Sequence, residues 1–197
     1  MELNNTYRKK MLHVIIYFAT KVKNPTKVKI FKLLYFADFE HFKETGNSIT
    51  NLDYYAYDFG PVPRHFYEEI SDNRVPKDFA PYITLLPFKS EGTGKQGAIF
   101  KVKEKIKPDL TIFSPRQKRI IEKFADMFRD VDAKMISDIS HFKNHPWDKT
   151  INEKGLFNKI DYVLAIDDEA KISIEDAMEA MKDRQEMLEA FPLKKTI

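Results

Sequence analysis

Apolar residues recur at helical spacing over two long stretches near the start of the chain. Residues 4–22 carry one apolar stripe, which predicts a helix with one buried face. Residues 25–45 are apolar nearly all round their middle, a pattern typical of a helix at the centre of a domain. Asn24-Pro25-Thr26 is expected to supply a break, an N-cap and a first-turn proline for the second helix, and Gly46 is expected to end that helix in the left-handed conformation.

Three further helices are predicted from their start signals. Ser114-Pro115-Arg116-Gln117 combines an N-cap serine, a first-turn proline and a capping-box glutamine. Asp132 is expected to cap a helix that ends near His141, after which Pro146-Trp147 is expected to lie in a connection. Ser173 is expected to cap a last amphipathic helix over about 173–191.

Alternating patterns predict a few short strands. One lies around Tyr54–Tyr57, and two more, Ile83–Phe88 and Ala98–Val102, form a hairpin joined by the glycine-rich stretch Ser90–Gly97. With the helices, this pattern predicts one α+β domain over residues 1–197, mainly helical, with a small antiparallel sheet or β-hairpin.

The stretch Tyr57-Asp58-Phe59-Gly60-Pro61-Val62-Pro63 is the sharpest local signal. Gly60 can adopt a positive φ, whereas Pro61 and Pro63 lack the backbone donor that a strand needs. We therefore expect a strand, an abrupt turn, and a helix that ends near Asn73. Tyr35, Tyr57 and Trp147 are candidates either to pack beneath this corner or to contact a partner, and the sequence leaves both options open.

The amino-acid composition and the charge pattern exclude several classes of protein. The chain has 197 residues, no cysteine, and 33 basic against 30 acidic residues, for a net charge of +3. Disulfides and thiolate metal sites are excluded, and no apolar run approaches the length that spans a bilayer. No secretory segment is visible, so a cytoplasmic protein is expected. Because basic and acidic residues alternate along the chain, no specific nucleic-acid or membrane binding is predicted.

Motifs that would indicate enzyme chemistry are weak. Gly92-Thr93-Gly94-Lys95-Gln96-Gly97 matches a dinucleotide fingerprint, but a strand pattern follows it where a helix is required, so a hairpin tip is the better interpretation. His141 and His145 have the i, i+4 spacing of helical metal ligands, yet no Glu lies between them and Pro146 follows at once.

Four carboxylates could supply acid–base chemistry if the fold brought them near the central helix: Asp38, Glu40, Asp53 and Asp58. The sequence gives no reason for them to meet. We therefore assign no catalytic residue, metal ligand or cofactor and predict that the protein is not an enzyme. The alternatives are a metal-dependent hydrolase that uses His141 and His145, and a nucleic-acid-binding protein suggested by the pI of about 8.8.

Lys29 and Lys32 interrupt the apolar helix at i, i+3. Their simplest interpretation is an exposed edge whose aliphatic stems cover apolar neighbours. The functional interpretation makes them contacts to a partner.

Three segments together resemble the Panacea domain, the SocA-like antitoxin family of bacterial and phage toxin–antitoxin operons. Lys29–Ala37 is similar to the family's K-x-x-K-L-L-Y-x-A helix, Ala56–Tyr67 contains its Gly-Pro turn, and Ile136–His141 leading to Pro146-Trp147 is like its L-S-x-x-T-H…P-W element. The resemblance covers about residues 10–150. Ser140 replaces the usual threonine, and residues 38–40 stand where many members carry a tryptophan-containing stretch.

The resemblance implies an antitoxin that neutralises a cognate protein toxin by direct binding. Toxins of such systems are diverse and include alarmone-synthetase-like enzymes that modify tRNA, and the systems are also found in phages and prophages. The residues that the resemblance and the turn mark as structural or partner-binding are Lys29, Lys32, Tyr35, Asp38, Tyr57, Asp58, Gly60, Pro61, Pro63, Tyr67, His141 and Trp147.

Overall fold

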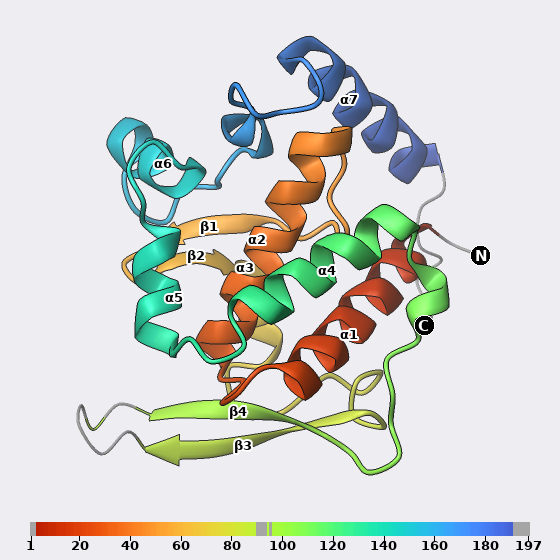
Figure 1. The fold of residues 1–197 in the computed structure, drawn as a ribbon, viewed down its shortest axis with the longest axis vertical. Helices are drawn as coiled ribbons and strands as arrows, with labels where there is room; N and C mark the ends of the chain where they lie inside the picture. Colours follow the sequence, from red (N-terminus) through yellow and green to blue (C-terminus); the bar gives the residue numbers. More distant parts are fainter. Residues whose placement is uncertain (1–2, 90–93, 95, 191–197) are drawn as a thin grey trace.

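The computed structural model describes residues 3–89, 94 and 96–190 and shows a mainly helical α+β fold (Figure 1). Its elements in chain order are α1 (Leu3–Lys21), α2 (Lys27–Thr45), β1 (Tyr54–Tyr57), β2 (Gly60–Pro63), α3 (Arg64–Glu69), β3 (Ile83–Lys89), β4 (Gln96–Val102), the 3-10 helix η1 (Leu110–Ile112), α4 (Pro115–Met127), α5 (Ala133–Ser140), α6 (Pro146–Lys154), the 3-10 helix η2 (Tyr162–Ala165) and α7 (Ile174–Ala190). The predicted fold class is confirmed.

Helix α2 is the centre of the fold, as its all-round apolar pattern predicts. It packs against α1, α4, α5, η2 and strands of both hairpins, and residues around its whole circumference are buried. The side chain of Thr26 accepts a hydrogen bond from the amide of Lys29, and Gly46 ends the helix at φ 69°. The predicted glycine end of this helix is confirmed, whereas its start lies two residues later than expected, because Thr26 is the N-cap and Pro25 precedes the helix instead of lying in its first turn.

The strands form two separate antiparallel hairpins rather than one sheet. The first, β1–β2, has a two-residue turn at Asp58-Phe59. Its outer edge along β1 is covered by a later segment, because Phe157 and Ile160 donate their amides to the carbonyls of Ala56 and Tyr54. The second hairpin, β3–β4, packs against α1 and the start of α2.

The prediction that Gly60-Pro61-Val62-Pro63 leaves the strand to begin a helix is wrong, because these residues form strand β2. In a hairpin with a two-residue turn, residues alternate between pairs that exchange backbone hydrogen bonds and pairs that do not. Pro61 lies opposite Ala56 and Pro63 opposite Tyr54, whose backbone groups bond outward to residues 157–160. Both prolines therefore occupy positions where no ladder donor is needed.

Three other predictions need correction or fall outside the described residues. Helix α3 ends at Glu69, well before Asn73. Pro146-Trp147 is not in a connection but begins α6, where proline is favoured because a first-turn amide has no helical partner. Most of the glycine-rich stretch, residues 90–93 and 95, lies outside the described residues, while Gln96 and Gly97 already belong to β4.

The expectation that Lys29 and Lys32 lie on an exposed edge is also wrong, since both are buried. The amine of Lys29 donates to the carbonyl of Lys23 at 2.7 Å and to that of Arg129 at 3.1 Å. These carbonyls end two different chain segments, after α1 and after α4. Lys29 therefore ties α1, α2 and α4 together at one end of the molecule.

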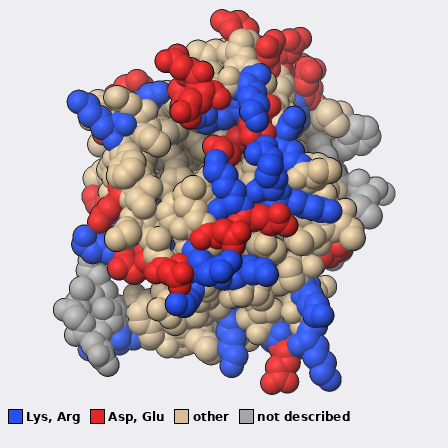
Figure 2. Space-filling model, viewed as in Figure 1, with Lys and Arg blue, Asp and Glu red and all other residues tan. Residues whose placement is uncertain are grey.

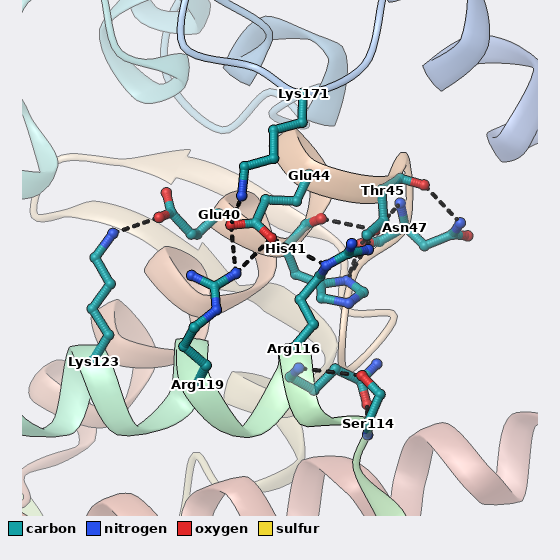
Figure 3. A network of polar contacts seen from close by, with 11 residues as sticks. Glu40, His41, Glu44, Thr45, Asn47, Ser114, Arg116, Arg119, Lys123 and Lys171 are labelled. Carbon is teal, nitrogen blue, oxygen red and sulfur yellow. Dashed lines mark hydrogen bonds and ion pairs between the residues drawn. The ribbon is translucent and has the colours of Figure 1, made fainter.

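Glu44 joins the other end of α2 to α4 (Figure 3). Its carboxylate, only 7% exposed, lies 2.7 Å from Arg119, 3.2 Å from Arg116 and 2.9 Å from Lys171. Burial raises the pKa of Glu44, but Arg119 and Lys171 outweigh that effect and lower the pKa to about 2. One carboxylate thus satisfies cations from α4 and from the segment before α7.

We expect Glu44→Gln to lower the free energy of unfolding by about 1–2 kcal/mol at low ionic strength, because three cations lose their counter-charge. The loss should shrink in 1 M salt. Since the folded pKa is depressed, this stabilisation is present above the ordinary glutamate pKa and is lost as pH falls toward 2.

Urea unfolding at two salt concentrations measures the effect. Glu40→Gln is the matched control, because Glu40 on the same helix forms a single ion pair among the described residues, with Lys123. Equal losses in the two variants would contradict a network centred on Glu44.

Candidate binding surface

The turn of the first hairpin is held by side chains from three helices. Every second carbonyl from residue 57 to residue 61 accepts a hydrogen bond from one of them. The bonds run from Trp147 Nε1 to the Tyr57 carbonyl at 3.0 Å, from Ser137 Oγ to the Phe59 carbonyl at 2.8 Å, and from Lys32 Nζ to the Pro61 carbonyl at 2.8 Å. Since the donors come from α6, α5 and α2, the hairpin joins these three helices.

Gly60 lies at the centre of this arrangement. Its φ is 90°, and a Cβ placed there would lie 2.8 Å from His141 Nε2 and 2.9 Å from Lys32 Nζ, with Ser140 Oγ closer still. No side chain fits in that space, and few L residues adopt that φ. Glycine is therefore required here by both the backbone angle and the contacts.

The two basic side chains beside Gly60 are disfavoured in their charged forms. Burial lowers the pKa of Lys32 to about 7. Burial also lowers the pKa of His141, and the nearby Lys32 adds to that effect. The His141 ring stacks on Trp147 with a centroid distance of 4.1 Å, which places it between the tryptophan and the glycine.

Asp38 organises the chain that leads into this hairpin. Its buried carboxylate accepts the amides of Ile49 and Thr50 at 2.8 and 2.9 Å, the hydroxyl of Tyr54 at 2.8 Å, and the hydroxyl of Thr50. Burial raises the pKa of Asp38 to about 6 although these donors favour the carboxylate. Asp38 therefore holds the loop between α2 and β1 in place.

Tyr35 packs beneath the hairpin rather than toward a partner. It is 2% exposed, and its ring contacts Tyr54 and Phe39 with centroid distances of 5.5 and 4.4 Å. Its buried hydroxyl lies beside the backbone of Trp147, and no described residue forms a well-aligned hydrogen bond with it. Of the two options left open for Tyr35, the structure places it in the core.

The outer side of the hairpin carries aromatic side chains on the surface. Tyr57 is half-buried between Tyr67, at a ring distance of 6.3 Å, and Phe157, at 5.1 Å. Tyr67, Phe157 and Phe59 are 42%, 57% and 63% exposed. Of the predicted site residues, Tyr57, Tyr67 and the exposed Asp58 are therefore accessible, whereas Gly60, Pro61 and Pro63 are buried.

A groove of about 350 Å³ runs along this surface between α2, the hairpin, α3 and β4. Val28, Phe31, Val62 and Tyr67 contribute its apolar lining, and Lys27 contributes a charge. We call it the α2–hairpin groove. Neither Val28 nor Phe157 is predictable as a surface residue of this kind, because isolated apolar residues on a helix or loop carry no pattern of their own.

The residues considered for enzyme chemistry are not brought together. His141 ends α5 and His145 precedes α6, so they do not share a helix. Glu40 pairs with Lys123 and Asp53 with Lys159, while Asp38 is enclosed as described. Within the described residues no group of three or more His, Asp or Glu is placed to hold a metal ion.

Charges of both signs are intermingled on the face shown in Figure 2, as their alternation along the sequence predicts. No helix among the described residues is both long and apolar enough to cross a membrane.

Comparison with known protein families shows to which family the chain belongs. The family model for the SocA-like antitoxins, the Panacea domain, matches residues 30–148. The chain belongs to the Panacea-domain family. No curated protein and no solved structure matches it.

The Panacea match contains the whole hairpin and all three of its donors. Lys32 and Trp147 were predicted as site residues from the family signature, and their role is to hold the turn. Ser137 was within the signature segment but was not singled out, since a serine on a helix gives no indication of the carbonyl it will meet. Lys29 and Asp38 also fix loops, so much of the Panacea signature maps to the framework around the hairpin.

We expect Gly60→Ala to lower the free energy of unfolding by about 3 kcal/mol or more, because a methyl group must displace His141 and Lys32 as well as hold a positive φ. Gly60→Val should be worse. Gly155→Ala is the matched control: Gly155 has φ 81°, but nothing lies within 4 Å of its Cβ position. That variant should lose about 1–3 kcal/mol from backbone strain alone, because φ 81° with ψ −172° is a region that glycine adopts far more readily than other residues. Similar losses at the two sites in denaturant unfolding would show that contacts at Gly60 cost nothing.

Lys32 should make stability rise with pH. Its folded pKa of about 7 lies below the ordinary value of 10.5, so between these pH values the unfolded chain binds the extra proton. The free energy of unfolding should therefore increase by up to about 1.4 kcal/mol per pH unit above pH 7. Urea unfolding at pH 7, 8 and 9 measures this slope. Lys32→Met removes the ionisable group, and parallel curves for the variant and the wild type would exclude the effect.

Proposed function

We propose that this protein is an antitoxin that neutralises a cognate protein toxin by binding it directly in the cytoplasm. The observation that carries the proposal is the match of residues 30–148 to the SocA-like antitoxin family. Shape recognition, rather than chemistry, is the activity we assign to the domain.

Two features of the structure support this proposal. The signature residues around the hairpin are engaged in holding helices together, which suits a scaffold. Exposed aromatic residues gather on the outer side of the same hairpin, and aromatic residues are enriched in protein interfaces. A rigid frame with an apolar outer surface fits a protein that acts by binding.

Co-expression with the product of the adjacent gene tests the proposal. We expect that product to arrest growth when expressed alone, growth to return when this protein is present, and the two proteins to co-purify. Gly60→Val should abolish protection because the frame is lost, whereas Gly155→Ala should retain it. An adjacent product that is harmless, or that forms no complex, would contradict the proposal.

A further inference from the structure

We propose that the α2–hairpin groove is where the partner binds, and that it accepts a partner segment carrying an apolar side chain next to a carboxylate. This inference rests on the proposed function, since it assumes a protein partner. It adds the surface used and the chemistry that the surface selects.

The apolar part of the proposal comes from the shape and lining of the groove. A volume of about 350 Å³ is enough for one or two large side chains. Val28 and Tyr67 line the groove and are 40% and 42% exposed. Both therefore present apolar surface that a partner could cover. The Tyr67 ring is itself supported by Phe31 at a centroid distance of 6.3 Å, so the wall is preformed. Preformed apolar walls reduce the cost of ordering on binding.

The acidic part comes from unbalanced charge. Lys27 lines the groove and supplies its charge, and none of the described residues lining it is acidic. Lys32 also lines the groove, but its buried amine, with a pKa lowered to about 7, adds only part of a charge. Each amine has one carbonyl acceptor, Ile70 for Lys27 and Pro61 for Lys32. An ammonium has three donors, so Lys27, which is half-buried at the groove wall, can still bind a carboxylate.

Acidic residues near the groove do not cancel this charge. Burial lowers the pKa of Lys27, and Asp72 opposes that effect only in part, since it also lies 3.7 Å from Arg74. Glu68 pairs with Arg64 at 2.9 Å. Asp58 is exposed in the hairpin turn and does not line the groove. A carboxylate brought by the partner is therefore the complement that the groove lacks, and such complementarity favours specific partners.

Substitutions at Val28 separate the apolar and the electrostatic contributions. Val28 is in the first turn of α2, where an acidic residue is compatible with the helix dipole, so Val28→Glu should fold normally. Val28→Lys makes the same position polar but positive. Ile174→Glu is the matched control, since Ile174 is 45% exposed in the first turn of α7, at the opposite end of the molecule from β3–β4 (Figure 1).

The measurement is calorimetric titration of each purified variant with the toxin encoded by the adjacent gene, after thermal unfolding has verified folding. We expect Val28→Glu to weaken binding at least about tenfold, Val28→Lys to weaken it clearly less, and Ile174→Glu to leave it unchanged. Equal losses for Val28→Glu and Val28→Lys would overturn the claim that the groove selects a partner carboxylate. Unchanged affinity for both would overturn the groove as the binding surface, while the proposed function would stand. Failure of the wild-type protein to bind would overturn the proposed function itself.

Discussion

The hydrogen bonds from Lys32, Ser137 and Trp147 to the carbonyls of the first hairpin are the interaction on which the rest of the structure depends. A two-stranded hairpin is only marginally stable alone in water. Here its backbone acceptors are used by α2, α5 and α6; α2 and α5 also pack directly against each other, whereas α6 packs against β1 and η2. The hairpin is thus stabilised by the helices and in turn sets their spacing.

The same arrangement explains why Gly60 is followed by prolines at positions 61 and 63. The donors can approach the turn only because Gly60 has no side chain, and the positive φ of Gly60 directs the chain back along β1. Pro61 and Pro63 restrict the returning strand at positions where no amide donor is required. Three residues that look like strand breakers therefore define one particular hairpin. The cost is a buried amine, and the lowered pKa of Lys32 is the sign of that cost.

Most of the helices and the fold class were predictable from the sequence, because caps and apolar stripes are local signals. Ser114 and Asp132 cap helices as their sequence context indicates. Strand β2 was missed because the penalty for a strand proline depends on which residue lies opposite, and pairing is not local. Burial of Lys29 and Lys32 was missed for a similar reason. The hydropathy value of a lysine reflects its own charge, but not the backbone carbonyls that other segments bring to its amine. The candidate site divides in the same way, since the signature indicated its frame and only the fold located the groove.

This division between frame and groove has a consequence for how a partner could be exchanged. The residues that hold the hairpin face inward, where a change in size leaves a clash or an unpaired polar group. Val28 on α2 and Tyr67 on α3 are 40% and 42% exposed, so a large part of each side chain is not used in packing the fold. Substitutions on the outer side can therefore alter recognition at little cost in stability. A protein built in this way can keep one fold while its outer surface is adapted to different partners.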